Sequence, residues 1–196
     1  MKKFFQLCLL VFLLPVTLYS VDYYDAGSQQ FSFKLGTNVP LFVHFFDDNT
    51  TLTGPGEGNT GMSMGGYGSI SYQVFNSPKT AIGGEIGYNF NFSAEKEFFS
   101  AVPFFAKYSY FPLQGTFDIP LSVGLGGAYI KYKTGSLMTL YTNFEVGAIW
   151  FPGENWGFGI STGIWLIPEL NYEENLMADN ALAGFIPITL SVTYRQ

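Results

Sequence analysis

Five ionisable residues are the first candidates for chemistry, because each stands on the small-residue face of an otherwise apolar, alternating segment. They are Lys34, Glu85, Lys107, Glu145 and Arg195. If these segments enclose a narrow interior, an unpaired charge there would be costly, so opposite charges should meet. We predict an interior network in which Glu85 contacts Lys107, with carboxylate-to-ammonium distances below about 6 Å. The main interpretation is a structural network that holds the shape of the interior, and the alternative is a proton or ion relay.

No set of residues in the sequence forms a catalytic or cofactor site. His44 is the sole histidine, so a multi-histidine metal site is excluded, and no serine nucleophile stands near it. The acidic clusters lack the spacing of a calcium loop and indicate solvated charge. Gly124, Gly126 and Gly127 do not open a helix and so do not predict a phosphate cradle; we expect them to leave room for Phe105. The sequence therefore predicts a protein that is not an enzyme and holds no cofactor or metal.

The N-terminus has the layout of a secretory signal peptide. A cationic Met1–Lys3 is followed by the almost unbroken apolar run Phe4–Leu14 and by Pro15–Ser20. The run is too short for a spanning helix, which needs about 20 residues. We predict a signal peptide at 1–20 and a single domain at 21–196. Cys8 lies inside the apolar run, so the exported chain would contain no cysteine, which excludes thiol chemistry and does not predict a lipid anchor.

The composition is acidic, aromatic and poor in charge. The formal net charge is −6, which excludes electrostatic attraction to nucleic acid. Charged residues make up 12% of the chain and aromatic residues 19%, whereas soluble domains carry about 25% charged residues. So little charge indicates a surface that meets lipid.

Period-two alternation of apolar with small or polar residues predicts eight β-strands after the signal peptide. Their length suits a tilted membrane crossing, which needs about 9–11 residues, and an even number lets the sheet close on itself. The predicted segments are Gln30–His44, Met62–Phe75, Thr80–Ser93, Phe98–Phe111, Phe117–Tyr129, Thr139–Trp150, Trp156–Leu170 and Ile186–Arg195.

The connections between these segments alternate in length. Short ones at 76–79, 112–116 and 152–155 contain proline or glycine, and the others, at 46–61, 94–97, 133–137 and 173–182, are mostly longer and more polar. Bacterial outer-membrane barrels combine short periplasmic turns with longer outer loops. We therefore predict an all-β fold, an eight-stranded antiparallel up-and-down transmembrane β-barrel.

The two faces of the strands indicate which side meets lipid. Ile86, Val123 and Leu190 represent the apolar face, and Ser71 and Asn89 represent the other, which is rich in Gly, Ser, Thr and Asn. A soluble carrier with a greasy interior would need many charges on its outer face, whereas small polar residues suit the narrow interior of an eight-stranded barrel. We expect the apolar face to point outward into lipid. A few apolar residues are nevertheless assigned inward: Phe42, Phe99, Phe105, Ile130, Trp165 and Ile167.

Aromatic residues gather near both ends of the predicted strands, as the interfacial girdles of membrane barrels do. The alternative is that aromatic residues merely favour strands. The predicted girdle residues are Tyr72, Tyr108, Tyr110, Trp150 and Trp156 at one end, and Phe90, Phe92, Tyr129 and Tyr172 at the other.

The signal peptide, the eight alternating strands and the paired girdles resemble the small outer-membrane β-barrel superfamily, which includes the OmpA transmembrane domain, OmpX, OmpW and opacity-like proteins. The composition, rich in aromatic and poor in charged residues, is similar to that of spirochaetal outer-membrane barrels. The resemblance implies a bacterial outer-membrane location, with the lipid bilayer and the barrel-assembly machinery as partners. Barrels of this kind often end in an aromatic residue, but here Tyr194 is followed by Arg195 and Gln196.

The resemblance implies two competing functions. The first is a surface-exposed interaction or structural role, with loops 46–61 and 173–182 binding an extracellular protein or an envelope partner. The second is a conduit for small hydrophobic ligands, similar to OmpW. A secreted soluble lipid-carrying barrel is a further alternative.

Overall fold

The computed structural model describes residues 23–92, 98–132, 135–169 and 180–196. The predicted signal peptide at 1–20, the predicted girdle residue Tyr172 and residues 173–179 of the predicted loop 173–182 lie outside this described part. Across the described ranges, no helical segment has the length and hydropathy that a membrane-spanning helix requires.

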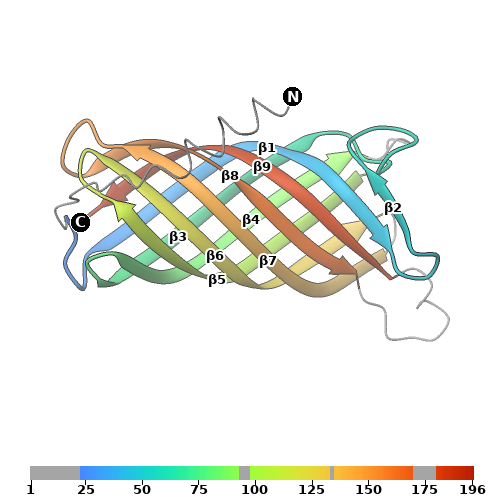
Figure 1. The fold of residues 1–196 in the computed structure, drawn as a ribbon, viewed down its shortest axis with the longest axis horizontal. Helices are drawn as coiled ribbons and strands as arrows, with labels where there is room; N and C mark the ends of the chain where they lie inside the picture. Colours follow the sequence, from blue (N-terminus) through green and yellow to red (C-terminus); the bar gives the residue numbers. More distant parts are fainter. Residues whose placement is uncertain (1–22, 93–97, 133–134, 170–179) are drawn as a thin grey trace, which may run out of the picture.

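The described chain forms a closed antiparallel barrel of long strands (Figure 1). From β3 to β9 each strand pairs with the next along the chain, and β1 pairs with both β3 and β9, which closes the sheet. The strands are β1 (Gln29–Phe45), β2 (Thr50–Thr53), β3 (Gly65–Ser77), β4 (Thr80–Phe92), β5 (Phe98–Leu113), β6 (Phe117–Tyr132), β7 (Gly135–Trp150), β8 (Trp156–Glu169) and β9 (Ala181–Arg195). The predicted fold class is confirmed.

Three elements differ from the prediction at the outer end. β9 begins at Ala181 and not at Ile186, so the last two residues of the predicted loop 173–182 belong to this strand. The short β2 was not predicted; it pairs with β1 alone within the described sheet and lies outside the eight-strand ring. Asn49 adopts a left-handed conformation (φ 52°) just before it, which allows the chain to turn back sharply. The predicted loop 133–137 is too long, because β7 already begins at Gly135, where it pairs with Tyr132 of β6.

The exposure of side chains confirms that the apolar face points outward. Ile86, Val123 and Leu190 are 55%, 39% and 67% exposed, whereas Ser71 and Asn89 are buried inside the barrel. A soluble barrel with a greasy interior would show the opposite arrangement, so that alternative is wrong. Lipid is the solvent that a continuous apolar outer wall requires.

A β-bulge in β1 reverses the predicted faces of two residues. The register of β1 against β9 shifts between Pro40 and Phe42. Beyond this point Val43 pairs with Ala183, which packs against the interior, so Val43 points inward. The ring of Phe42, which was assigned inward, lies instead against Gly184. One extra residue in a strand is enough to exchange its faces.

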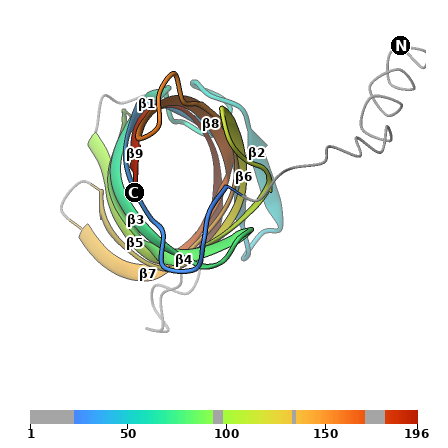
Figure 2. The same ribbon diagram turned by 90° about the vertical axis from the view of Figure 1, so that its left-hand side faces the viewer.

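Both described chain ends lie at one end of the barrel, together with the short turns β3–β4, β5–β6 and β7–β8 (Figure 1). Figure 2 looks into the barrel from this end. Because short turns face the periplasm in bacterial barrels, we refer to this end as the periplasmic end and to the opposite end as the outer end.

Candidate functional site

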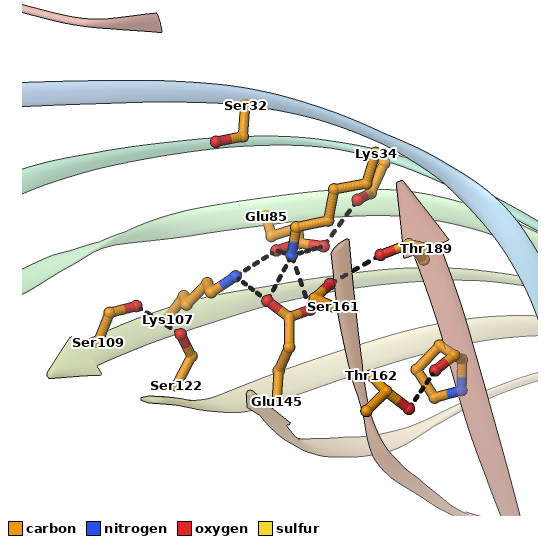
Figure 3. A network of polar contacts seen from close by, with 12 residues as sticks. Ser32, Lys34, Glu85, Lys107, Ser109, Ser122, Glu145, Ser161, Thr162 and Thr189 are labelled. Carbon is orange, nitrogen blue, oxygen red and sulfur yellow. Dashed lines mark hydrogen bonds and ion pairs between the residues drawn. The ribbon is translucent and has the colours of Figure 1, made fainter. Parts of the chain in front are cut away.

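Four charged side chains meet inside the barrel and form an ion-pair ring, which consists of Lys34, Glu85, Lys107 and Glu145 (Figure 3). The Lys34 ammonium lies 3.0 Å from Glu85 and 2.7 Å from Glu145. The Lys107 ammonium lies 2.9 Å from Glu85 and 3.0 Å from Glu145. Each ammonium therefore contacts both carboxylates, and the ring is electrically neutral.

The four residues come from four separate strands, β1, β4, β5 and β7. Alternation turns each of them inward, and the registers between the strands bring them to one level. Two further inward residues of β3 complete the site, because Tyr67 and Ser69 donate hydrogen bonds to Glu85 at 2.9 and 2.7 Å. Sequence reasoning did not include Tyr67, which follows a glycine pair and gave no clear alternation signal.

Because the ring is buried, its four charges are removed from water, which costs free energy. All four charged side chains are less than 8% exposed. Buried charges lose their hydration, and the loss is offset only when each one is paired and hydrogen-bonded. The closed pattern of two ammoniums and two carboxylates meets this condition, so the ring can hold the strands in register and fill the interior at this level.

Arg195 is not part of the ring, and the predicted five-residue network is wrong on this point. Lys34 pairs in register with Ser191 of β9, so Arg195 lies four residues closer to the periplasmic end. There its Nη1 atom lies 3.6 Å from the carboxylate of Asp118. The register between β9 and β1 decides this separation, and alternation alone does not reveal it.

An apolar cluster fills the interior on the outer side of the ring. Phe105 and Phe99 precede Lys107 on β5, which runs from the outer end toward the periplasm, and both are buried. The ring of Tyr67 lies 4.4 Å from that of Trp165 across the interior. Met62 was assigned outward, but it precedes the first residue of β3 and packs against this cluster. The buried members are Tyr67, Phe99, Ala101, Phe105, Ala128, Ile130, Tyr141, Trp165, Ile167 and Phe185.

Gly124 and Gly126 of β6 approach Phe105 closely, as predicted, but the prediction is wrong for Gly127, where an added Cβ would lie 2.8 Å from the Phe104 ring. A Cβ atom on Gly124 would lie 2.5 Å from the Phe105 ring, and one on Gly126 would lie 2.2 Å from the Phe104 carbonyl oxygen and 2.5 Å from the Phe105 Cα, both backbone atoms of β5. Real Cβ atoms do not approach other atoms so closely, so any larger residue would displace the aromatic side chain or the β5 backbone. These glycines therefore belong to the packing of the interior.

The predicted girdle residues that the structure describes lie on the outer wall. Trp150 and Trp156 stand at the two ends of the β7–β8 turn and are about half exposed. Phe90 is partly covered, because its ring stacks on that of Phe98 with centroids 5.9 Å apart. Their contact with the membrane interface stays a prediction. The exposed members are Tyr72, Phe92, Tyr108, Tyr110, Tyr129, Trp150 and Trp156.

His44 lies at the outer end of β1 and is partly exposed. Its Nδ1 atom is 2.9 Å from the Thr51 hydroxyl of β2, and its ring packs edge-on against Phe46. The contact with Thr51 joins β2 to β1. Within the described ranges, no group of three or more His, Cys, Asp or Glu side chains could hold a metal ion.

Comparisons with known proteins agree with this architecture. A protein-family model matches residues 14–194. The chain is 24% identical over 214 residues to an uncharacterized protein of Borreliella burgdorferi, covering 98% of this chain and 96% of that protein. The crystal structure of Neisserial surface protein A superposes with a TM-score of 0.56 at 10% identity, covering 84% of this chain and 96% of the other. The crystal structure of the outer membrane protein OprG from Pseudomonas aeruginosa has a TM-score of 0.49 at 11% identity, and the match covers 90% of this chain and 99% of OprG.

The neisserial structure shares the fold, and the Borreliella relative agrees with the spirochaetal resemblance. The family match spans nearly all of the described chain. The described chain therefore has the fold of the small eight-stranded outer-membrane β-barrels.

Proposed function

We propose that this protein is a non-enzymatic outer-membrane barrel that acts at its outer surface by binding an extracellular or envelope partner. The outer loop, residues Phe46–Gly61, is the main contact region, together with loop 173–182. The observation that carries the proposal is the filled interior of the barrel.

The interior leaves solutes no open path in the described residues. The ion-pair ring occupies one level, and the apolar cluster occupies the levels toward the outer end. Eight-stranded barrels are just wide enough for side chains to fill them. If nothing passes through the protein, its interactions with other molecules must take place at its surfaces.

The outer loop is built as an ordered projection. Its β2 strand pairs antiparallel with the outer part of β1. The backbone amide of Gly54 donates a hydrogen bond to the Leu41 carbonyl at 2.8 Å. The Thr60 hydroxyl donates to the Gly54 carbonyl at 2.7 Å, and Phe46 is about half exposed. A loop with a set conformation loses less entropy when a partner binds.

The charge of the outer loop suggests the chemistry of the partner. Asp47, Asp48 and Glu57 are exposed, and the range 46–61 contains no Lys or Arg. Like charges repel, so an acidic loop disfavours acidic partners and favours a basic protein surface.

Neutralising the outer loop is expected to weaken partner binding. In the triple variant Asp47→Asn, Asp48→Asn, Glu57→Gln, binding of outer-membrane vesicles to immobilised basic host or envelope proteins should fall, together with its dependence on salt. Glu154→Gln, an acidic residue exposed at the periplasmic end, is the matched control. Equal binding by the triple variant and the control would exclude the outer loop as the contact region.

A conduit for small hydrophobic molecules is the second candidate, because the outer part of the interior is apolar. Against it stands the packing of that region, in which the rings of Phe105 and Tyr141 stack at 5.0 Å and Trp165 is 1% exposed.

The filled interior predicts no conductance. Purified protein in a planar bilayer should show no ion current above background, and vesicles that contain it should take up an apolar dye no faster than protein-free vesicles. A large porin measured in the same bilayers is the positive control. Protein-dependent uptake of the dye would favour the conduit over the surface role.

A further inference from the structure

The segment that precedes β1, residues Tyr23–Ser28, lies at the periplasmic end of the barrel, and we call it the strap. The backbone amide of Tyr23 donates to the Gln114 side chain in the β5–β6 turn at 3.0 Å. Gly27 donates to the Phe75 carbonyl at 2.7 Å, and Phe75 donates to the Ser28 carbonyl at 2.8 Å. The strap is thus attached to both sides of the opening.

Tyr24 is the part of the strap that fills the opening. Its side chain is 3% exposed, and its ring stacks on Phe75 with centroids 3.9 Å apart. Phe111 packs beside the two rings, and the Tyr24 hydroxyl donates to the Asp118 carboxylate. Burial, together with the nearby carboxylate, raises the pKa of Tyr24 well above its ordinary value. The phenol therefore keeps its proton and remains a hydrogen-bond donor.

Arg195 binds the strap from the other end of the chain. Its guanidinium lies between the rings of Tyr23 and Phe151, at 3.8 and 3.6 Å from their centroids. Its Nε and Nη1 atoms donate to the carbonyls of Glu154 and Gly115 at 2.7 and 2.9 Å. A planar guanidinium can stack on rings and donate in its own plane at the same time, which a lysine cannot do.

A small chamber lies between the strap and the ion-pair ring, and its wall is partly apolar, because Pro120, Ile149 and Ile160 also face it. Gln30, Ser71, Gln73, Ser122 and Thr193 line its wall, and Lys34 and Lys107 of the ring lie at its inner end. The side-chain nitrogen of Gln30 is buried and has no hydrogen-bond partner in the protein. A buried amide donor that has other polar side chains around it is normally satisfied by ordered water.

We propose that the strap and Arg195 form a periplasmic clasp that separates this chamber, and with it the ion-pair ring, from periplasmic water. On the outer side, the apolar cluster closes the interior. The clasp needs the segment before β1 and the last residue of β9, so it forms only after β9 has paired with β1 and the barrel has closed. It lies at the end opposite the outer loop, so the clasp and the proposed surface function can fail independently.

The test measures how fast a small thiol reagent reaches the chamber. The full chain carries Cys8→Ser, to remove the natural cysteine, and Ser122→Cys as the probe; it is exported, purified in detergent and treated with methyl methanethiosulfonate. Labelling should be slow when the clasp is intact. Tyr23→Ala and Arg195→Gln should each raise the rate at least about tenfold, which corresponds to about 1.4 kcal/mol less free energy of opening.

Phe46→Ala is the matched control, because this aromatic residue is half exposed, like Tyr23, but lies at the outer end. It should leave the labelling rate unchanged. The shift in gel mobility on heating shows which variants have folded. Tyr23→Ala decides the matter if Arg195→Gln does not fold, since Tyr23 is 46% exposed and its loss disturbs less packing. Equal labelling rates in folded Tyr23→Ala and the parent, or an equal rise with Phe46→Ala, would overturn the clasp.

Discussion

Glu85→Gln is expected to lower the free energy of unfolding by about 3–5 kcal/mol, because it leaves the ammoniums of the ion-pair ring with one carboxylate for two buried positive charges. Glu85 is the acceptor for Lys34, Lys107, Tyr67 and Ser69. A neutral amide of the same shape cannot compensate both ammoniums. Guanidinium unfolding in phospholipid vesicles, followed by tryptophan fluorescence, measures the change.

The double variant Glu85→Gln, Lys107→Met distinguishes loss of charge balance from general damage to the interior. Removing one charge of each sign restores neutrality, so the double variant should be more stable than Glu85→Gln alone. Glu57→Gln in the outer loop is the surface control and should change stability by no more than about 0.5 kcal/mol. If the double variant loses as much free energy of unfolding as Glu85→Gln and Lys107→Met lose in sum when each is made alone, the ring is not a coupled unit.

Leu190→Arg should lower the free energy of unfolding by about 2–4 kcal/mol in a bilayer, because it places a charge in the hydrocarbon core. Leu190 is 67% exposed and pairs with Leu35, next to the Lys34–Ser191 pair at the level of the ion-pair ring. The cost comes from the lipid and not from lost packing. In an aqueous environment the same exposed position would accept arginine readily.

Phe117→Arg provides the matched comparison. Phe117 is 53% exposed and is the first residue of β6, at the periplasmic rim. A charge near the interface costs only about 0–1 kcal/mol, because the side chain can reach water. The difference between the two variants, measured by unfolding in the same vesicles, reports depth in the bilayer. Equal losses at Leu190 and Phe117 would contradict the membrane placement of the outer wall.

Much of this fold was predictable because consecutive residues of a β-strand point to opposite faces of the sheet. Ile86 and Glu85 are adjacent in the sequence, and the pleat alone sends one outward and the other inward. The same local rule placed Lys34, Lys107 and Glu145 inside the barrel. Their pairing followed from energy, since a narrow interior leaves opposite buried charges few other partners. The limits of the signal peptide at 1–20 and of the barrel domain at 21–196 stay predictions.

What alternation could not supply is position along the barrel axis. The level of a residue depends on the register summed over several strand pairs, and one bulge changes it. The bulge at Pro40–Phe42 turned Val43 inward, and the register of β9 carried Arg195 away from the ring to Asp118. Alternation could not predict the position of the strap either. Tyr24 stacks on Phe75 and donates to Asp118, and both residues are distant from it in sequence.

The sequence by itself therefore determined the strands, their outward and inward faces, and the charges that the interior had to neutralise, because these properties depend on residues one or two positions apart. The tertiary structure decided which inward residues share a level, that side chains fill the interior, and that the segment before β1 meets Arg195 of β9 at the periplasmic opening. These depend on contacts between strands far apart in the chain, which form only when the sheet closes.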